Sequence, residues 1–129
     1  MNPLNPQDWF IKASRDLLLA KNSLQDISSY PDLICYHCQQ AAEKFLKALV
    51  LHHGLPVKKT HDLVELLDIL KPVEVCIDIT YYDEALKIKF YAVNARYPDT
   101  GGDPSDADVF EALASAEFFR NFAKTVLGI

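Results

Sequence analysis

The 129-residue chain contains only four glycines, and this scarcity restricts the kinds of site that it can build. It has no glycine-rich loop that would cradle phosphates and no G-x-S-x-G turn that would present a catalytic serine. It also has only three cysteines, an odd number that provides no disulfide framework and is typical of a reducing compartment. The composition therefore argues against a P-loop enzyme, a serine hydrolase and a disulfide-stapled secreted domain.

Long apolar runs are missing too, because no segment approaches the length that spans a bilayer. The first residues, MNPLNPQDWF, lack the basic start and apolar core of a secretion signal. We therefore expect a cytoplasmic protein that does not enter a membrane.

Positive charge is not in excess, since the formal net charge is −5. Proteins that coat nucleic acids bind by neutralising phosphates, so this balance argues against that class. The charges are nevertheless uneven: four lysines, three histidines and one acid lie in 41–61, whereas six acids and no base lie in 99–117. This asymmetry is compatible with a local anion site, with two solvated faces, or with pairing of two subunits.

The chain is rich in helical periodicity, and its length predicts one domain over residues 1–129. Apolar residues recur at three- and four-residue steps in five segments, at about 6–25, 33–53, 60–71, 80–96 and 104–127. We therefore expect an all-α, compact up-and-down bundle of four to five helices.

Details of these helices are also predicted. The second has a buried stripe through Cys38, Phe45, Leu49 and His52, with a solvated polar side opposite. The third is capped by the Thr60 hydroxyl. The polar side of the second helix consists of Gln39, Gln40, Glu43, Lys44 and Lys47.

The fifth helix has the clearest start signal, with Asp103 as the N-cap and Pro104 at the first helical position. Before the fourth helix, VEVCIDI (73–79) alternates like a strand but has no partner strand, so we expect an extended connection or an irregular helix start. The fourth helix carries two apolar stripes, which predicts packing between neighbours or against a second subunit.

Two cysteines on the second helix, Cys35 and Cys38, share a face and lie near several histidines. A zinc site normally needs four ligands, and no second cysteine pair exists. We therefore interpret them as buried free thiols and expect neither a metal nor another cofactor.

The end of the fourth helix, ARYPD (95–99), places Arg96 and Tyr97 before Pro98, which disfavours helix at the preceding residue. A cation in the last turn interacts favourably with the helix dipole, and Asp99 is a possible surface partner. The alternative is that Arg96 awaits an anionic ligand.

Three segments together resemble the HEPN domain family. HCQQAAEKFLKALVLHHGLPVKKTHDL (37–63) is similar to its second helix and following loop, and ARYPD is similar to a motif of one bacterial and archaeal branch. The first and last helices also fit, so the resemblance covers most of the chain.

The resemblance implies a helical bundle that dimerises, association with nucleotides or RNA, and a toxin role beside a nucleotidyltransferase antitoxin. Catalytic members are metal-independent ribonucleases with an arginine followed after four to six residues by a histidine. Here no histidine follows Arg96, since the four histidines all precede it. Binding without cleavage is therefore the preferred hypothesis.

Three hypotheses follow. The first is a homodimer that binds a nucleotide or RNA phosphate with a nucleotidyltransferase partner, the second an RNA endonuclease that uses Arg96 with His61, and the third a ligand-free dimeric scaffold. The predicted phosphate-binding residues are Arg96, Tyr97, Asp99, Lys44, Lys47 and His61.

Overall fold

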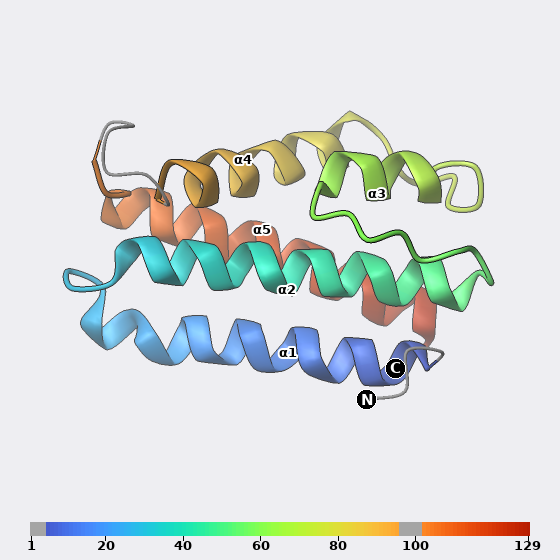
Figure 1. Ribbon diagram of the computed structural model, residues 1–129, viewed down its shortest axis with the longest axis horizontal. Helices are drawn as coiled ribbons and strands as arrows, with labels where there is room; N and C mark the ends of the chain where they lie inside the picture. Colours follow the sequence, from blue (N-terminus) through green and yellow to red (C-terminus); the bar gives the residue numbers. More distant parts are fainter. Residues whose placement is uncertain (1–4, 96–101) are drawn as a thin grey trace.

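The structure is a computed structural model that describes residues 5–95 and 102–129, with the side chains of all of these except 93–95. Within these ranges the chain forms five α-helices and no strand, which confirms the predicted all-α bundle (Figure 1). The helices are α1 (Pro6–Asn22), α2 (Pro31–His52), α3 (Leu63–Leu70), α4 (Ile79–Ala95) and α5 (Asp106–Leu127), with a 3₁₀ turn, η1 (Ser23–Asp26), after α1.

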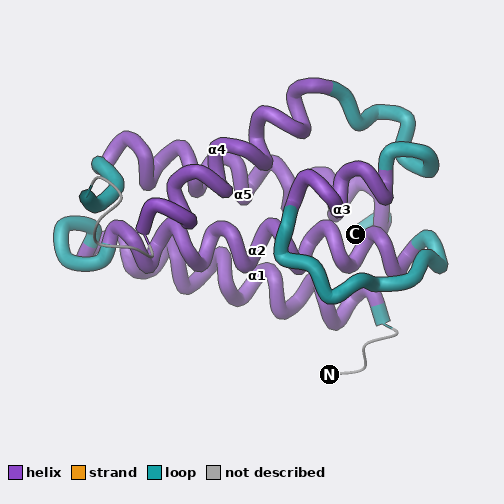
Figure 2. The backbone as a smooth tube through the Cα atoms, turned by 45° about the horizontal axis from the view of Figure 1, so that its top comes forward, coloured by secondary structure: helices purple, strands orange, loops and turns teal. Residues whose placement is uncertain are grey.

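Helix α2 forms the centre of the bundle, because it packs against α1, α3, α4 and α5. Figure 2 shows α1 running beside α2, with α3 and α4 on the other side of α2. Of its 22 residues 14 are buried, so the helix is covered on most of its circumference. Its largest core side chain, Phe45, contacts Phe10 of α1 with the ring centroids 5.2 Å apart.

The predicted solvated side of α2 is wrong at three positions, since Gln39, Glu43 and Lys47 are buried. His61 contacts Gln39 and Glu43, and the Lys47 ammonium group lies 6.0 Å from the ring centroid of Trp9 in α1. Hydrophobic periodicity contains no information about such long-range coverage. The predicted stripe is buried at Cys38, Phe45 and Leu49. It is wrong at His52, which is exposed because it is the last residue of the helix.

The predicted start of α3 is wrong by two residues. Asp62 is the N-cap, and its carboxylate accepts a hydrogen bond from the Val64 N–H at 3.0 Å. The Thr60 hydroxyl instead accepts from the Asp62 N–H at 3.1 Å and donates to Glu65 at 2.8 Å. A carboxylate at the cap also interacts with the helix dipole, which favours Asp62 over the neutral hydroxyl.

The predicted start of α5 is also wrong, because Ser105 and not Asp103 is the N-cap. The Ser105 hydroxyl accepts from the Asp108 N–H at 3.1 Å, while the Asp108 carboxylate accepts from the Ser105 N–H at 3.0 Å. This reciprocal pair satisfies two backbone donors at once, whereas Asp103 as a simple cap satisfies one. Pro104 therefore precedes the helix.

The segment between α3 and α4 forms no strand, as predicted, but it is a series of turns and not an extended chain. The Val73 N–H donates to the Leu70 carbonyl oxygen at 3.0 Å, and the Ile77 N–H donates to that of Glu74 at 3.2 Å. Its alternating apolar residues do not share a buried face: Val75 is 96% exposed, whereas Ile77 is 4% exposed. Ile77 attaches the connection to the core, and α4 begins two residues later.

The two apolar stripes of α4 have different surroundings. Ala85, Ile88 and Ala92 are buried against the bundle, whereas Leu86 is 51% exposed and Phe90 is 62% exposed. The stripe of Ala85, Ile88 and Ala92 is therefore covered within a single copy of the chain, whereas the opposite side of α4 is exposed at Leu86 and Phe90.

Candidate functional site

A cavity of about 340 Å³ lies where α2, α4 and the segment before α3 meet. Its volume is at the lower end of the range of small-molecule sites. Most of the lining residues are of polar types, and they come from parts of the chain that are far apart in the sequence. It consists of Gln39, Gln40, Glu43, Thr60, His61, Asp62, Lys89 and Ala92.

A buried carboxylate organises one side of the cavity. Glu43 Oε1 lies 2.9 Å from His61 Nδ1, and Glu43 Oε2 lies 3.0 Å from Lys47 Nζ. The Glu43 and Lys47 side chains are 5% and 8% exposed, whereas the His61 side chain is 81% exposed. The imidazole is therefore attached to the protein interior through one ring nitrogen while the rest of the ring faces solvent.

The backbone of His61 is attached to the same helix face. The Gln39 side-chain N–H donates to the His61 carbonyl oxygen at 3.1 Å, and Gln39 lies one helical turn before Glu43. The Gln39 Oε1 atom is buried and has no hydrogen-bond partner among the described residues. Two successive turns of α2 thus position His61 by its main chain and by its ring.

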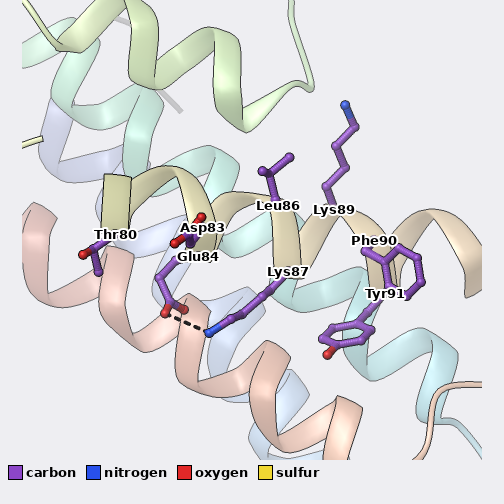
Figure 3. Close-up of a pocket in the computed structure, with 8 residues that line it drawn as sticks. All are labelled: Thr80, Asp83, Glu84, Leu86, Lys87, Lys89, Phe90 and Tyr91. Carbon is purple, nitrogen blue, oxygen red and sulfur yellow. Dashed lines mark hydrogen bonds and ion pairs between the residues drawn. The ribbon is translucent and has the colours of Figure 1, made fainter. Parts of the chain in front are cut away.

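The cation on the α4 side of the cavity is Lys89. It also lines a broader hollow on the exposed face of α4, where Glu84 and Lys87 form an ion pair at 3.3 Å (Figure 3). In Figure 3 the Lys89 side chain extends away from that pair. No carboxylate of the described residues forms an ion pair with Lys89, so its charge is available to an anion.

The predicted phosphate-binding residues do not all gather at this cavity. His61 lines it, whereas Lys47 is buried beneath Glu43. Lys44 does not line it, because its ammonium group lies 2.6 Å from Asp16 Oδ2 of α1. The remaining predicted residues, Arg96, Tyr97 and Asp99, lie outside the described residues.

The prediction of buried thiols in α2 is confirmed, because Cys35 and Cys38 are fully buried. Burial, with a smaller contribution from Asp108, raises the pKa of Cys35 to about 12, and burial also raises the pKa of Cys38. Both thiols are therefore protonated near neutral pH. In the part of the chain that the structure describes, no cluster of three His, Cys, Asp or Glu side chains could hold a metal ion.

Sequence reasoning missed Lys89, Glu43 and Gln39 as site residues. A signal existed for Lys89, because it precedes Arg96 by seven residues, the spacing of two helical turns. For Glu43 and Gln39 the sequence carries no such signal, since their role depends on a loop residue about 20 positions away.

None of the described helices is both long enough and apolar enough to cross a membrane. Comparison with curated proteins finds no match. Among solved structures, TT1696 from Thermus thermophilus is similar, with 30% sequence identity, a TM-score of 0.81, and coverage of 97% of this chain and 98% of that one.

A second similar structure is ST0689, described as an archaeal HEPN homologue, with 26% identity, a TM-score of 0.72 and coverage of 94% of this chain and 96% of that one. The model of the HEPN domain matches residues 6–126, nearly the whole length of the chain. The sequence resemblance is thus confirmed, and the chain belongs to the HEPN domain family.

Proposed function

We propose that this HEPN domain protein binds a phosphate group of a nucleotide or of RNA at the cavity between α2 and α4. The observation that carries the proposal is the meeting of Lys89, whose charge no described carboxylate neutralises, with the exposed ring of His61 in one cavity. The Lys89 ammonium group is a suitable donor to phosphate oxygens, and the His61 ring beside it can accept a hydrogen bond from a hydroxyl group of the same nucleotide.

Arg96 completes the proposed phosphate contacts. Arg96 follows Lys89 by seven residues, the spacing of two helical turns, and on this sequence spacing we propose that both contact the same phosphate. Tyr97 offers a ring for base stacking, and Asp99 is proposed nearby as a polar contact. Lys44 and Lys47 are weaker candidates, because their ammonium groups already pair with carboxylates.

Titration with labelled mononucleotides and short RNA tests this proposal. We expect Arg96→Ala and Lys89→Ala each to raise Kd about tenfold or more, because a charged hydrogen bond contributes about 1.5–3 kcal/mol. Lys12→Ala removes the same charge from the exposed surface of α1 and serves as the control, with an unchanged Kd expected. Equal Kd values for all variants, or no binding by the wild type, would reject the proposal and leave a ligand-free scaffold.

The contact between Glu43 and His61 favours RNA cleavage as a second candidate function. In this scheme Arg96 stabilises the charge on the phosphate, and His61 removes the proton from the attacking 2′-hydroxyl. The 2′-oxygen bonds to phosphorus as the bond from phosphorus to the 5′-oxygen breaks, and the leaving 5′-oxygen takes a proton from water. Incubation with RNA in excess chelator is the test, and His61→Ala should abolish cleavage. RNA that stays intact over a wide range of wild-type concentrations would eliminate this candidate.

We also propose that the protein is a homodimer and that a second copy covers the exposed face of α4. Leu86 and Phe90 form an apolar stripe there, with Asp83 nearer the start of the helix and Lys87 nearer its end. If two α4 helices pack antiparallel about a twofold axis, each Asp83 faces the lysine end of the other copy. This charge complementarity supports the proposal of a second copy as the partner of the stripe, with Lys87 then shared between Glu84 of its own chain and Asp83 of the other.

The family also suggests a nucleotidyltransferase protein as partner, in a cytoplasmic two-gene system of the toxin–antitoxin type. The uneven distribution of charge along the chain is compatible with such a protein contact. Purification from the native host followed by mass spectrometry tests this partner. If no nucleotidyltransferase copurifies at physiological salt, this part of the proposal fails.

A further inference from the structure

We propose that Glu43 is a positioning residue, which holds the neutral His61 ring with its proton on Nδ1 and so presents Nε2 as a hydrogen-bond acceptor. The proposal concerns the free protein, and only its consequence for ligand binding rests on the proposed function.

The burial of Glu43 explains why its contacts are specific. A buried carboxylate needs partners for both oxygens, because an unpaired buried charge is strongly destabilising. Lys47 satisfies Oε2 at 3.0 Å, and His61 Nδ1 satisfies Oε1 at 2.9 Å. Since the Glu43 side chain is only 5% exposed, solvent is a poor substitute for either partner.

The chemistry of these partners determines the tautomer of the ring. An ionised carboxylate only accepts hydrogen bonds, so Nδ1 must carry a proton to donate to Glu43. In a neutral imidazole the other nitrogen is then unprotonated and accepts hydrogen bonds. A ligand at the cavity would therefore meet Nε2 of His61 as an acceptor, and the group that it presents there must be a donor, such as a hydroxyl or an amine.

The main chain of His61 is restrained by the same helix. Gln39 donates to the His61 carbonyl oxygen from the turn of α2 that precedes Glu43. Because α2 is the most enclosed helix of the bundle, these two attachment points are rigid. The His61 ring is therefore held at its main chain by Gln39 and at Nδ1 by Glu43, although 81% of the side-chain surface faces solvent.

Replacing Glu43 with glutamine should move the proton of His61 from Nδ1 to Nε2 while preserving the shape of the side chain at position 43. Lys47 is donor-only, so the new amide must turn its oxygen toward Lys47. The amide NH₂ then faces His61 Nδ1, which must become an acceptor, and the proton moves to Nε2. Glu43→Gln thus predicts the opposite tautomer of His61.

Nitrogen-15 NMR of the histidine side chains, recorded at a pH where the rings are neutral, shows directly which ring nitrogen of His61 carries the proton. The signal of His61 is assigned from its loss in His61→Gln. Glu74→Gln is the matched control, because Glu74 Oε1 lies 2.7 Å from Nε2 of another histidine, His53. We expect protonated Nδ1 at His61 in the wild type and in Glu74→Gln, and protonated Nε2 in Glu43→Gln.

Protonated Nε2 in the wild type, or an unchanged tautomer in Glu43→Gln, would overturn the proposal. If Glu43→Gln does not fold, the tautomer of His61 in the wild type is by itself the test of the proposal.

The nucleotide titration distinguishes the positioning role of Glu43 from the proposed phosphate binding. We expect Kd to rise about two- to tenfold in Glu43→Gln, because Nε2 no longer accepts the hydrogen bond from the hydroxyl or amine of the ligand. Expected tautomers without nucleotide binding reject only the proposed function, whereas wild-type binding with the wrong tautomer rejects only the positioning role.

Discussion

The three thiols of the chain differ sharply in accessibility at the scale of the single residue. Cys35 and Cys38 are fully buried with raised pKa values, whereas Cys76 is exposed. Because the thiolate is the reactive form, we expect one rapid equivalent with a disulfide reagent in the native state and three after denaturation. Cys76→Ser should remove the rapid phase. Two or three rapid equivalents in the native protein would contradict the burial of the α2 thiols.

Individual helices depend on local hydrogen bonds that can be removed one at a time. The reciprocal contacts of Ser105 and Asp108 satisfy two donors at the start of α5. We expect Ser105→Ala to lower the free energy of unfolding by about 1 kcal/mol, measured by urea denaturation. Ser29→Ala, at an exposed turn residue, should stay within about 0.5 kcal/mol of the wild type. Equal effects of the two variants would contradict the capping role of Ser105.

The contact between α3 and α4 predicts a loss of stability at alkaline pH. The Tyr82 hydroxyl donates to Asp68 at 2.7 Å. Burial, followed by this hydrogen bond, raises the pKa of Tyr82 to about 12, against about 10 in the unfolded chain. Between these values only the folded protein keeps the proton, so the stabilisation is complete below about pH 10 and is lost as pH rises toward about 12.

We therefore expect Tyr82→Phe to make the free energy of unfolding fall less steeply between about pH 10 and about pH 11. Some decline should remain, since Tyr81 and Tyr91 also have pKa values raised to about 12. Urea titrations at each pH measure the slope, and identical slopes for the variant and the wild type would exclude a contribution from Tyr82.

At the scale of the whole molecule, the exposed stripe of α4 predicts the oligomeric state. We expect light scattering to give twice the 14.6 kDa mass of one chain for the wild type. Phe90→Glu should give the monomer mass, because it places a charge in the apolar contact. Leu18→Glu changes a similarly exposed apolar residue of α1 and should remain dimeric. A monomeric wild type would refute the proposed contact.

The helices and the core were predictable from the sequence because each depends on residues three or four positions apart. The cap residues were wrong by two positions, since several acceptors compete within one turn, as Thr60 and Asp62 do. Of the site, His61 was predicted, but its attachment to Glu43 was not. That contact joins residues 18 positions apart, and Glu43 has the helical spacing of a solvated residue.

The central position of α2 affects how the protein unfolds and how it tolerates change. Four helices pack against α2, so none of them can detach without exposing apolar surface of α2 to solvent. Partial melting should therefore be rare, and the molecule should denature cooperatively as one unit. Inserted residues are best accommodated in the loops between helices. An insertion within 31–52 would shift the contacts of α2 with all four neighbouring helices at once.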